Sequence, residues 1–213
     1  EIADRFGVPI VEDDPYGQLR YEGEHLPPLS VLDNQIQASP NRYTSNVIYL
    51  STFSKTLAPG IRLAWVIATQ EVINKLNLAK QGADLHTSTF NQMVAYEVAD
   101  GGFLNDHVKF IRKVYKERRD AMIDSLSEHM PQGVVWTKPQ GGLFLWVTAP
   151  ECVDCQDLFE DAAKEKVAFV PGSSFYAEGG GNNSMRLNFS NENPNNINEG
   201  ILRLSKLIKA NIQ

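Results

Sequence analysis

The chain has little cysteine, no long apolar segment and no excess of basic residues. Its 213 residues include two cysteines, too few for the disulfide framework of a small secreted domain. No uninterrupted apolar run approaches the ~20 residues that cross a bilayer, and the mean hydropathy is −0.29. The 20 Lys and Arg against 26 Asp and Glu give a net charge of −6, which disfavours binding to nucleic acid. These absences favour a cytoplasmic globular protein without membrane or nucleic-acid partners.

The beginning of the chain also lacks an initiator methionine and an N-cap. Ile2 and Phe6 lie four residues apart, and Gly7 stands where a helix would end. We therefore expect the chain to begin inside a helix, as a fragment whose upstream half is absent. A short native helix whose methionine has been removed is the alternative.

Apolar runs and amphipathic segments alternate in the first part of the chain. Three short runs, at residues 8–11, 47–50 and 64–68, predict buried strands, and a proline-containing loop is expected at residues 22–46. Apolar positions at helical spacing predict helices that include residues 72–79, 91–98 and 104–126. The basic residues of the last helix lie off its apolar stripe and predict a solvated face rather than an anion-binding patch: Lys109, Arg112, Lys116 and Arg119.

After Pro131 the pattern changes to short strands, one helix and a final helix. Pro194 is expected at the first turn of the final helix, with Asn193 as its N-cap. The preceding elements are strands at residues 134–137, 143–147, 167–170 and 185–189 and a helix at residues 157–166. The fold class is therefore α/β, with an α/β part followed by a smaller α+β part.

Polar residues follow two of the predicted strands. If the strands at residues 8–11 and 47–50 are parallel, their carboxyl ends share one sheet edge, which is where ligands bind in open α/β sheets. Residues 58–60 suit a tight turn that returns the chain to the same edge. The side chains that would converge there are Asp13, Tyr16, Thr52, Ser54, Lys55 and Arg62.

Several segments resemble motifs of one enzyme family. Residues 52–62 resemble the lysine segment of the fold-type I, class I/II aminotransferases, which use pyridoxal 5′-phosphate, and residues 12–17 resemble that family's Asp-x-x-Tyr segment. Residues 139–146 are similar to its small-domain hairpin and residues 184–189 to its C-terminal arginine strand. Residues 80–86 look like the 2-aminoadipate aminotransferase branch. The resemblance covers the whole chain but only the C-terminal half of a full family member.

The resemblance implies an enzyme that moves an amino group between an amino acid and a 2-oxo acid. It implies that residues 1–118 form the C-terminal portion of the large cofactor-binding domain and that residues 119–213 form a small α+β domain. Family members build their site as homodimers. Several cofactor contacts come from the half that is absent here, so the 213-residue fragment is expected to be a weak or inactive catalyst.

The resemblance also implies which residues contact the pyridine ring. Lys55 would bind the cofactor covalently and later move a proton at the substrate α-carbon. Asp13 would pair with the pyridine nitrogen, because it lies three residues before Tyr16 as in the family, whereas Asp14 lies two before. Tyr16 would donate its phenol to the 3′-oxygen. An acidic loop or weak cation site at residues 12–14 is the alternative.

The remaining roles concern two anionic groups. Thr52, Ser54 and Arg62 would bind the cofactor phosphate; the family more often has serine where Thr52 stands, and threonine keeps the hydroxyl. Arg186, in an apolar strand, would bind the substrate α-carboxylate, with a structural salt bridge as the alternative. No metal site is expected, because Cys152 and Cys155 form a single pair without histidines at ligand spacing.

Other interpretations remain beside the enzyme. Some transcriptional regulators fuse a DNA-binding domain to an aminotransferase-like domain, and the segment preceding this one would distinguish them. Another reaction on the same cofactor, by a β-lyase or a decarboxylase, is the third possibility. The amino-acid specificity is not encoded in recognisable residues. Trp136, Phe144 and Trp146 are expected in the small-domain core, with Phe144 as a second candidate for the substrate pocket.

Overall fold

The computed structural model describes residues 1–37 and 43–212. The chain divides into two compact units, Glu1–Ile111 and Arg112–Gln213, and each is described by itself below. The longest helix, α5 (Phe103–His129), contributes residues to both units. The boundary between the cofactor-binding domain and the small domain, expected at residues 118–119, stays a prediction.

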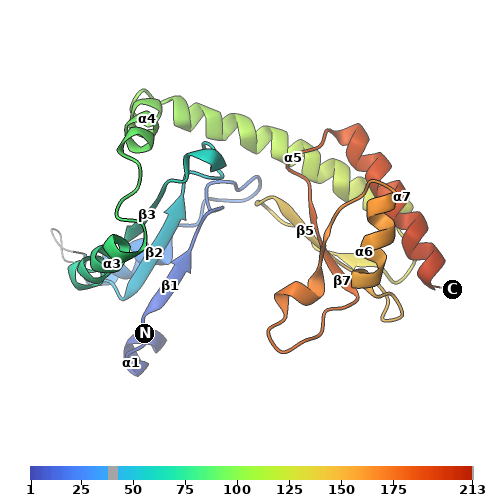
Figure 1. Ribbon diagram of the computed structural model, residues 1–213, viewed down its shortest axis with the longest axis horizontal. Helices are drawn as coiled ribbons and strands as arrows, with labels where there is room; N and C mark the ends of the chain where they lie inside the picture. Colours follow the sequence, from blue (N-terminus) through green and yellow to red (C-terminus); the bar gives the residue numbers. More distant parts are fainter. Residues whose placement is uncertain (38–42, 213) are drawn as a thin grey trace. The chain divides into compact units, whose positions relative to one another are not determined.

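A three-stranded sheet organises the first unit, in the order β1-β2-β3 (Figure 1). Strand β1 (Ile10–Asp13) is parallel to β2 (Val47–Thr52), with Asp13 opposite Leu50, which confirms the parallel pairing assumed from the sequence. Strand β3 (Ala64–Ile67) returns antiparallel to β2. The carboxyl ends of β1 and β2 therefore meet at one edge.

Helical segments precede, separate and follow the three strands along the sequence. Helix α1 ends at Gly7, whose φ of 63° is the left-handed conformation that glycine adopts readily. Ser88 caps the helix that follows it by accepting a hydrogen bond from the N–H of Asn91. The helical elements of this unit, besides the start of α5, are α1 (Ile2–Phe6), α2 (Leu29–Gln37), η1 (Pro59–Ile61), α3 (Gln70–Ala83) and α4 (Thr89–Asp100).

Helix α2 lies where the sequence predicted only a loop, so that prediction is wrong for residues 29–37. The carboxylate of Glu12, on β1, accepts hydrogen bonds from the N–H groups of Leu29 (2.8 Å) and Ser30 (3.1 Å). These are N–H groups of the first turn, which have no partner inside the helix. The N-terminal cap of α2 is therefore a side chain of β1, 17 residues before Leu29 in the sequence. Residues 38–42 of the predicted loop lie outside the described residues.

The second unit contains a four-stranded antiparallel sheet, in the order β4-β5-β7-β6. Its last helix begins at Pro194, and Asn193 accepts a hydrogen bond from the N–H of Asn196, as predicted. Of the strand predicted at residues 167–170, only Val170 belongs to a strand. The elements are β4 (Val135–Trp136), β5 (Phe144–Thr148), α6 (Cys155–Lys164), β6 (Val170–Pro171), η2 (Gly172–Phe175), β7 (Ser184–Asn188) and α7 (Pro194–Ile212).

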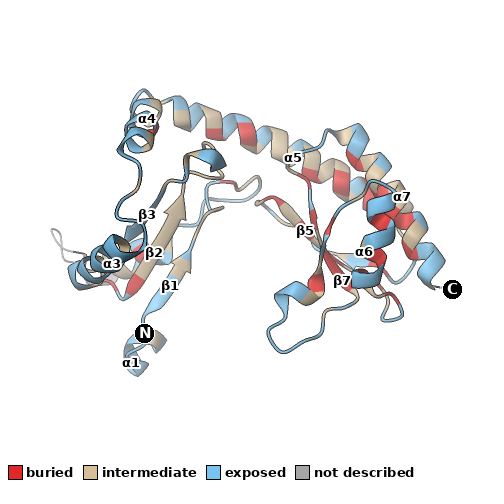
Figure 2. Cartoon of the chain, in the orientation of Figure 1, coloured by how far each residue is buried: buried red, intermediate tan, exposed pale blue. Residues whose placement is uncertain are grey.

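Alternation along β5 and β7 gives this sheet one buried face. Leu145 and Val147 of β5 and Met185 of β7 are fully buried and Leu187 is 3% exposed, whereas the residues between them are more exposed. Helices supply the opposing side chains, and Figure 2 shows the buried residues concentrated on α7, β5 and β7. The helical members of this core are Met122, Leu126, Leu158, Ala162, Ile197, Ile201, Leu204 and Ile208.

Two sequence predictions about this unit are wrong. Trp136, Phe144 and Trp146 are not in the core; Phe144 and Trp146 alternate onto the face of β5 opposite Leu145. Arg119 is not solvated: its side chain is 4% exposed. Both errors come from judging a residue by its type or its helical position without knowing the neighbouring strand and loop.

The described residues contain no helix that combines the length and the apolar character needed to cross a membrane. In the same residues, no cluster of three or more histidine, cysteine, aspartate or glutamate side chains has the arrangement of a metal site.

Candidate active site

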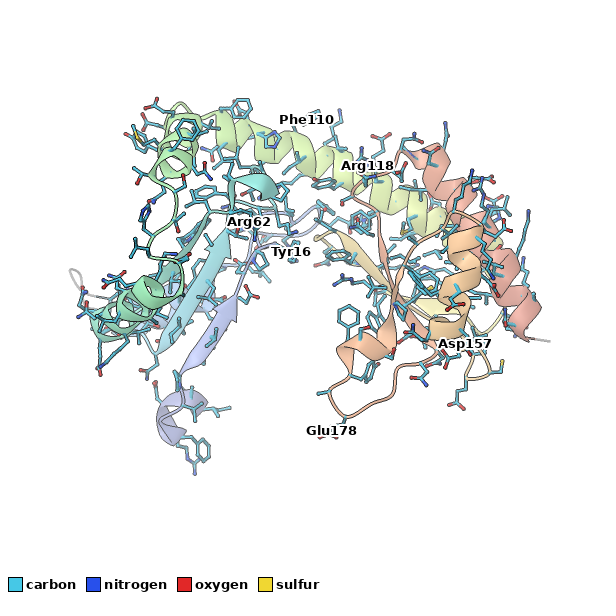
Figure 3. The ribbon with its side chains drawn as sticks, viewed as in Figure 1. Tyr16, Arg62, Phe110, Arg118, Asp157 and Glu178 are labelled. Atoms are coloured by element: carbon cyan, nitrogen blue, oxygen red, sulfur yellow. The ribbon has the colours of Figure 1, made fainter. Side chains whose placement is uncertain are left out.

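The candidate site lies at the carboxyl edge of the parallel strand pair in the first unit. Asp13 is the last residue of β1, and Lys55 follows the end of β2 by three residues. Tyr16 and Arg62 lie near this same end of the sheet (Figure 3). The structure thus brings together the residues of the first unit that the sequence singled out.

Three consecutive acidic residues have three different environments here. Glu12 caps α2, and Asp14 accepts hydrogen bonds from the N–H of Gly17 (2.6 Å) and the hydroxyl of Tyr49 (3.0 Å). Among the described residues, none donates a hydrogen bond to the carboxylate of Asp13. A carboxylate at a ligand-binding edge without a protein partner can accept a hydrogen bond or ion pair from a ligand. This difference agrees with the choice of Asp13 over Asp14.

Tyr49 and Ser51 are two further polar residues at this edge, to which the sequence assigned no role. Both belong to β2 and lie two residues apart, so they share one face of the strand. Tyr49 binds the carboxylate of Asp14, and the hydroxyl of Ser51 donates to its main-chain oxygen (2.8 Å). Burial raises the pKa of Tyr49 and the neighbouring Asp14 raises it further, while a hydrogen bond with Ser51 acts in the opposite direction. The alternation of Tyr49 and Ser51 with apolar residues along β2 was the sequence pattern that could have indicated a shared polar face.

Lys55 occupies the turn that follows β2. The turn closes through hydrogen bonds from the N–H groups of Leu57 (2.8 Å) and Ala58 (3.1 Å) to the carbonyl of Phe53. The Nζ of Lys55 lies 5.8 Å from the centroid of the Tyr16 ring, a cation–π distance. Both side chains are half-buried. An amine and a phenol are therefore adjacent at this edge.

Two hydroxyl groups and a guanidinium lie next to that turn. The Oγ1 of Thr52 is 2.9 Å from the Oγ of Ser54 and accepts a hydrogen bond from the Ser54 N–H (3.1 Å). The predicted turn forms η1, and it places Arg62 in the left-handed region at φ 50°. The exposed guanidinium of Arg62 donates to the carbonyl of Pro59 (3.0 Å). Asn91 fixes the turn by donating to the carbonyl of Ile61 (2.9 Å).

Arg186 belongs to the second unit, on the less buried face of β7. Its Cζ lies 4.1 Å from the Phe144 ring centroid and 4.8 Å from that of Phe175. Its Nε is buried and has no hydrogen-bond partner among the described residues. Within those residues no carboxylate forms an ion pair with Arg186, so the structural salt bridge is not supported. A guanidinium held between aromatic rings and lacking an acceptor can bind an external carboxylate.

The cysteines are free thiols, Cys152 exposed and Cys155 buried. Burial raises the pKa of Cys155 to about 12, with a smaller contribution from Asp154. Such a thiol is inert as a nucleophile. His86 is exposed, with its Nδ1 2.9 Å from the carbonyl of Thr87.

Comparisons with known proteins agree with this fold. The model of the family "Aminotransferase class I and II" matches residues 1–204, so the chain belongs to that family. The chain is 46% identical over its full length to aromatic-amino-acid aminotransferase 1 of Thermococcus litoralis, covering 49% of that protein. It thus spans about half the length of the curated relatives it matches.

A solved structure is similar to this chain over nearly its whole length. LysN, an α-aminoadipate aminotransferase of Thermus thermophilus crystallised with N-(5′-phosphopyridoxyl)-L-leucine, matches with a TM-score of 0.91 and 39% identity over 99% of this chain and 52% of that one. This similarity confirms the family resemblance inferred from the sequence, including its relation to 2-aminoadipate aminotransferases. The HTH-type transcriptional regulator YisV of Bacillus subtilis is 32% identical over 91% of this chain and 38% of the regulator.

Proposed function

We propose that this chain belongs to a pyridoxal 5′-phosphate-dependent aminotransferase, which transfers an amino group between an amino acid and a 2-oxo acid. The observation that carries the proposal is the carboxyl edge of β1 and β2, where the unpartnered carboxylate of Asp13 and the amine of Lys55 follow neighbouring strands. These residues fit the cofactor, which needs an anion at its pyridine nitrogen and a lysine at its aldehyde.

Three side chains would act on the cofactor ring and the substrate. When bound, pyridoxal phosphate supplies an electron sink for the electrons released at the substrate α-carbon. Asp13 would keep a proton on the pyridine nitrogen. Tyr16 would donate a hydrogen bond from its phenol to the 3′-oxygen. Lys55, whose amine lies 5.8 Å from the centroid of the Tyr16 ring, would remove and return the proton at the α-carbon.

The phosphate would be bound by the residues around the turn after β2. Thr52 and Ser54 carry hydroxyl groups 2.9 Å apart, and Arg62 carries a guanidinium whose fork matches a phosphate. Arg62 is exposed, and one of its N–H groups donates to the carbonyl of Pro59. Its remaining donors would therefore be available for an anion.

Arg186 would bind the α-carboxylate of the substrate. The proposal is supported by its buried, unpartnered Nε and by the rings of Phe144 and Phe175 on its guanidinium. Aromatic neighbours remove water from the guanidinium and so strengthen a bidentate contact with a carboxylate. Residues 1–118 would then belong to the cofactor-binding domain and residues 119–213 to the small substrate-contacting domain.

The whole protein is proposed to be a cytoplasmic homodimer acting on amino and 2-oxo acids. The exposed apolar side chains of the first unit, among them Phe90, Met93 and Phe110, would be suitable for an interface. The free thiols of Cys152 and Cys155 are compatible with a reducing compartment.

An aminotransferase-like effector domain of a transcriptional regulator is the second candidate, because the similarity to YisV covers nearly the same residues. A regulator that uses the cofactor as a sensor would bind the cofactor but would not convert an amino acid to product. A β-lyase or decarboxylase would turn over without a 2-oxo acid. Product analysis separates these three outcomes.

The experiment uses the full-length protein supplied with pyridoxal phosphate. We expect the cofactor absorbance band and 2-oxoglutarate-dependent consumption of an amino acid from a panel of acidic, aromatic and branched substrates. Lys55→Ala should abolish turnover, while Lys75→Ala, which changes an exposed lysine of α3, should not. Cofactor binding without turnover favours the regulator, and pyruvate, ammonia or carbon dioxide release without 2-oxoglutarate favours the other reactions.

A further inference from the structure

Two adjacent arginines on α5 bind main-chain carbonyls at one end of the β5–β7 strand pair. A guanidinium nitrogen of Arg118 donates to the carbonyl of Ser190, which follows β7. Arg119 donates to the carbonyl of Pro139 (2.7 Å), which precedes β5. The strands are antiparallel with Phe144 opposite Asn188, so the start of β5 and the end of β7 are neighbours. Figure 3 shows Arg118 on α5.

The burial of Arg119 is compensated by fixed partners. Its side chain is 4% exposed, and its Nε and Nη2 lie 2.9 and 2.5 Å from the same carboxylate oxygen of Asp120. Lys116 binds the other oxygen of Asp120 (2.7 Å). A buried guanidinium is costly unless its donors are satisfied, and the carbonyl of Pro139 satisfies one of them. The loop that begins at Pro139 is thereby attached to α5.

This end of the strand pair carries the aromatic neighbour of Arg186. Phe144 is the first residue of β5, and its ring lies on the Arg186 guanidinium. The connection between Pro139 and Phe144 contains Gly141 and Gly142, the latter at φ 79°, which favours glycine. Glycine loses more backbone freedom on ordering than other residues, so the contact at Pro139 adds to the strand pairing of Phe144 with Asn188 in holding this segment.

We propose that Arg118 and Arg119 are positioning residues for substrate binding: they hold the end of the β5–β7 pair so that Phe144 stays on the guanidinium of Arg186. The inference rests on the proposed role of Arg186 as the substrate-carboxylate residue. Neither arginine contacts substrate in this scheme. Their effect is on the affinity for the carboxylate and not on the proton transfer.

The test uses full-length protein loaded with pyridoxal phosphate. We expect Arg118→Ala and Arg119→Lys each to raise the Kd for glutarate, a dicarboxylate that cannot be transaminated, and the KM for 2-oxoglutarate by about 5- to 10-fold, with kcat changed less than about 2-fold. Arg118→Lys should restore the wild-type values, because its single carbonyl contact needs one donor. Arg119→Lys cannot serve both Pro139 and Asp120.

Arg203 provides the matched control. It also joins a helix, α7, to a main-chain carbonyl, that of Glu165 (3.1 Å), but this carbonyl follows α6 and belongs neither to the loop before β5 nor to the segment after β7. Arg203→Ala should therefore leave KM and the glutarate Kd unchanged. Hydrogen–deuterium exchange gives a readout without turnover: amides of residues 140–146 should exchange faster in Arg119→Lys and Arg118→Ala than in wild type and Arg203→Ala.

The outcomes separate this inference from the proposed function. A wild-type protein that neither binds the cofactor nor transaminates refutes the proposed function. An active wild type whose arginine variants keep the wild-type KM, or exchange normally at residues 140–146, refutes the positioning role alone. An equal loss in Arg203→Ala also refutes it, because the effect would then be one of general stability.

Discussion

The two units differ in how they use their apolar residues. Among the described residues, six apolar side chains are buried in the first unit and 19 in the second, whereas 20 large apolar side chains are exposed in the first and four in the second. Figure 2 shows the same contrast in burial. The second unit packs helices on one face of its sheet and has its own core. The first unit carries the proposed cofactor residues on a sheet whose apolar surface needs further partners.

The largest expected effect comes from matched leucines in the two units. Leu204 of α7 is fully buried, and Leu76 of α3 is 43% exposed. Leu204→Ala should lower the free energy of unfolding by about 3–4 kcal/mol, because it leaves a cavity, whereas Leu76→Ala should cost about 1 kcal/mol or less. Urea unfolding followed by circular dichroism measures both. Equal losses would contradict the contrast between the units.

Substitutions of the adjacent residues Asp13 and Asp14 should affect different properties, catalysis for Asp13 and stability for Asp14. Asp13→Asn should leave the free energy of unfolding of the 213-residue chain within about 0.5 kcal/mol of wild type, but lower kcat of the full-length enzyme about 100-fold. Asp14→Asn loses an acceptor for Gly17 or Tyr49 and should cost about 1–2 kcal/mol of stability. Finding these two outcomes exchanged would assign the pyridine nitrogen to Asp14.

Cys155 tests the packing of the second unit through pH. The unfolded thiol loses its proton near pH 9, whereas burial in the folded state raises the pKa of Cys155 to about 12. The folded state therefore holds a proton that the unfolded state has lost, and stability should fall by about 1.4 kcal/mol per pH unit from pH 9 towards 12. The difference between wild type and Cys155→Ala isolates this slope from other titrations. Parallel stability curves for the two proteins would show that Cys155 is not desolvated.

The smallest expected effect concerns the cap of α2. Glu12→Gln keeps an acceptor but removes the charge at the helix N-terminus, so it should cost about 1 kcal/mol of unfolding free energy. Glu178→Gln, at an exposed loop position, is the control and should have no measurable effect. A Glu12 variant as stable as the control would mean that α2 does not depend on β1.

The parts of the fold that follow from local patterns were predictable. Strands β1, β2, β5 and β7 and helices α3 to α7 follow from apolar periodicity, although their bounds shift by a few residues. Helix α2 was not predictable, because its cap is the side chain of Glu12 from a separate strand. Arg119 was assigned to solvent because its partner, the carbonyl of Pro139, lies in a loop 20 residues later.

The candidate site was predictable to the extent that strand topology determines it. Parallel pairing of β1 and β2 is enough to bring Asp13 and Lys55 to one edge. The different environments of Asp13 and Asp14, and the contribution of Tyr49, depend on side-chain contacts across that pair. The spacing of the family motif selected Asp13; the hydrogen bonds of Asp14 are consistent with that choice, which stays a prediction.

The most direct test identifies the lysine that carries the cofactor. Borohydride reduction of the full-length protein with pyridoxal phosphate fixes the cofactor to that lysine, and peptide mapping by mass spectrometry locates it. The proposed function predicts a single modified peptide containing Lys55 and no such peptide from Lys55→Ala. Labelling at another lysine, or none in the wild-type protein, would contradict the account.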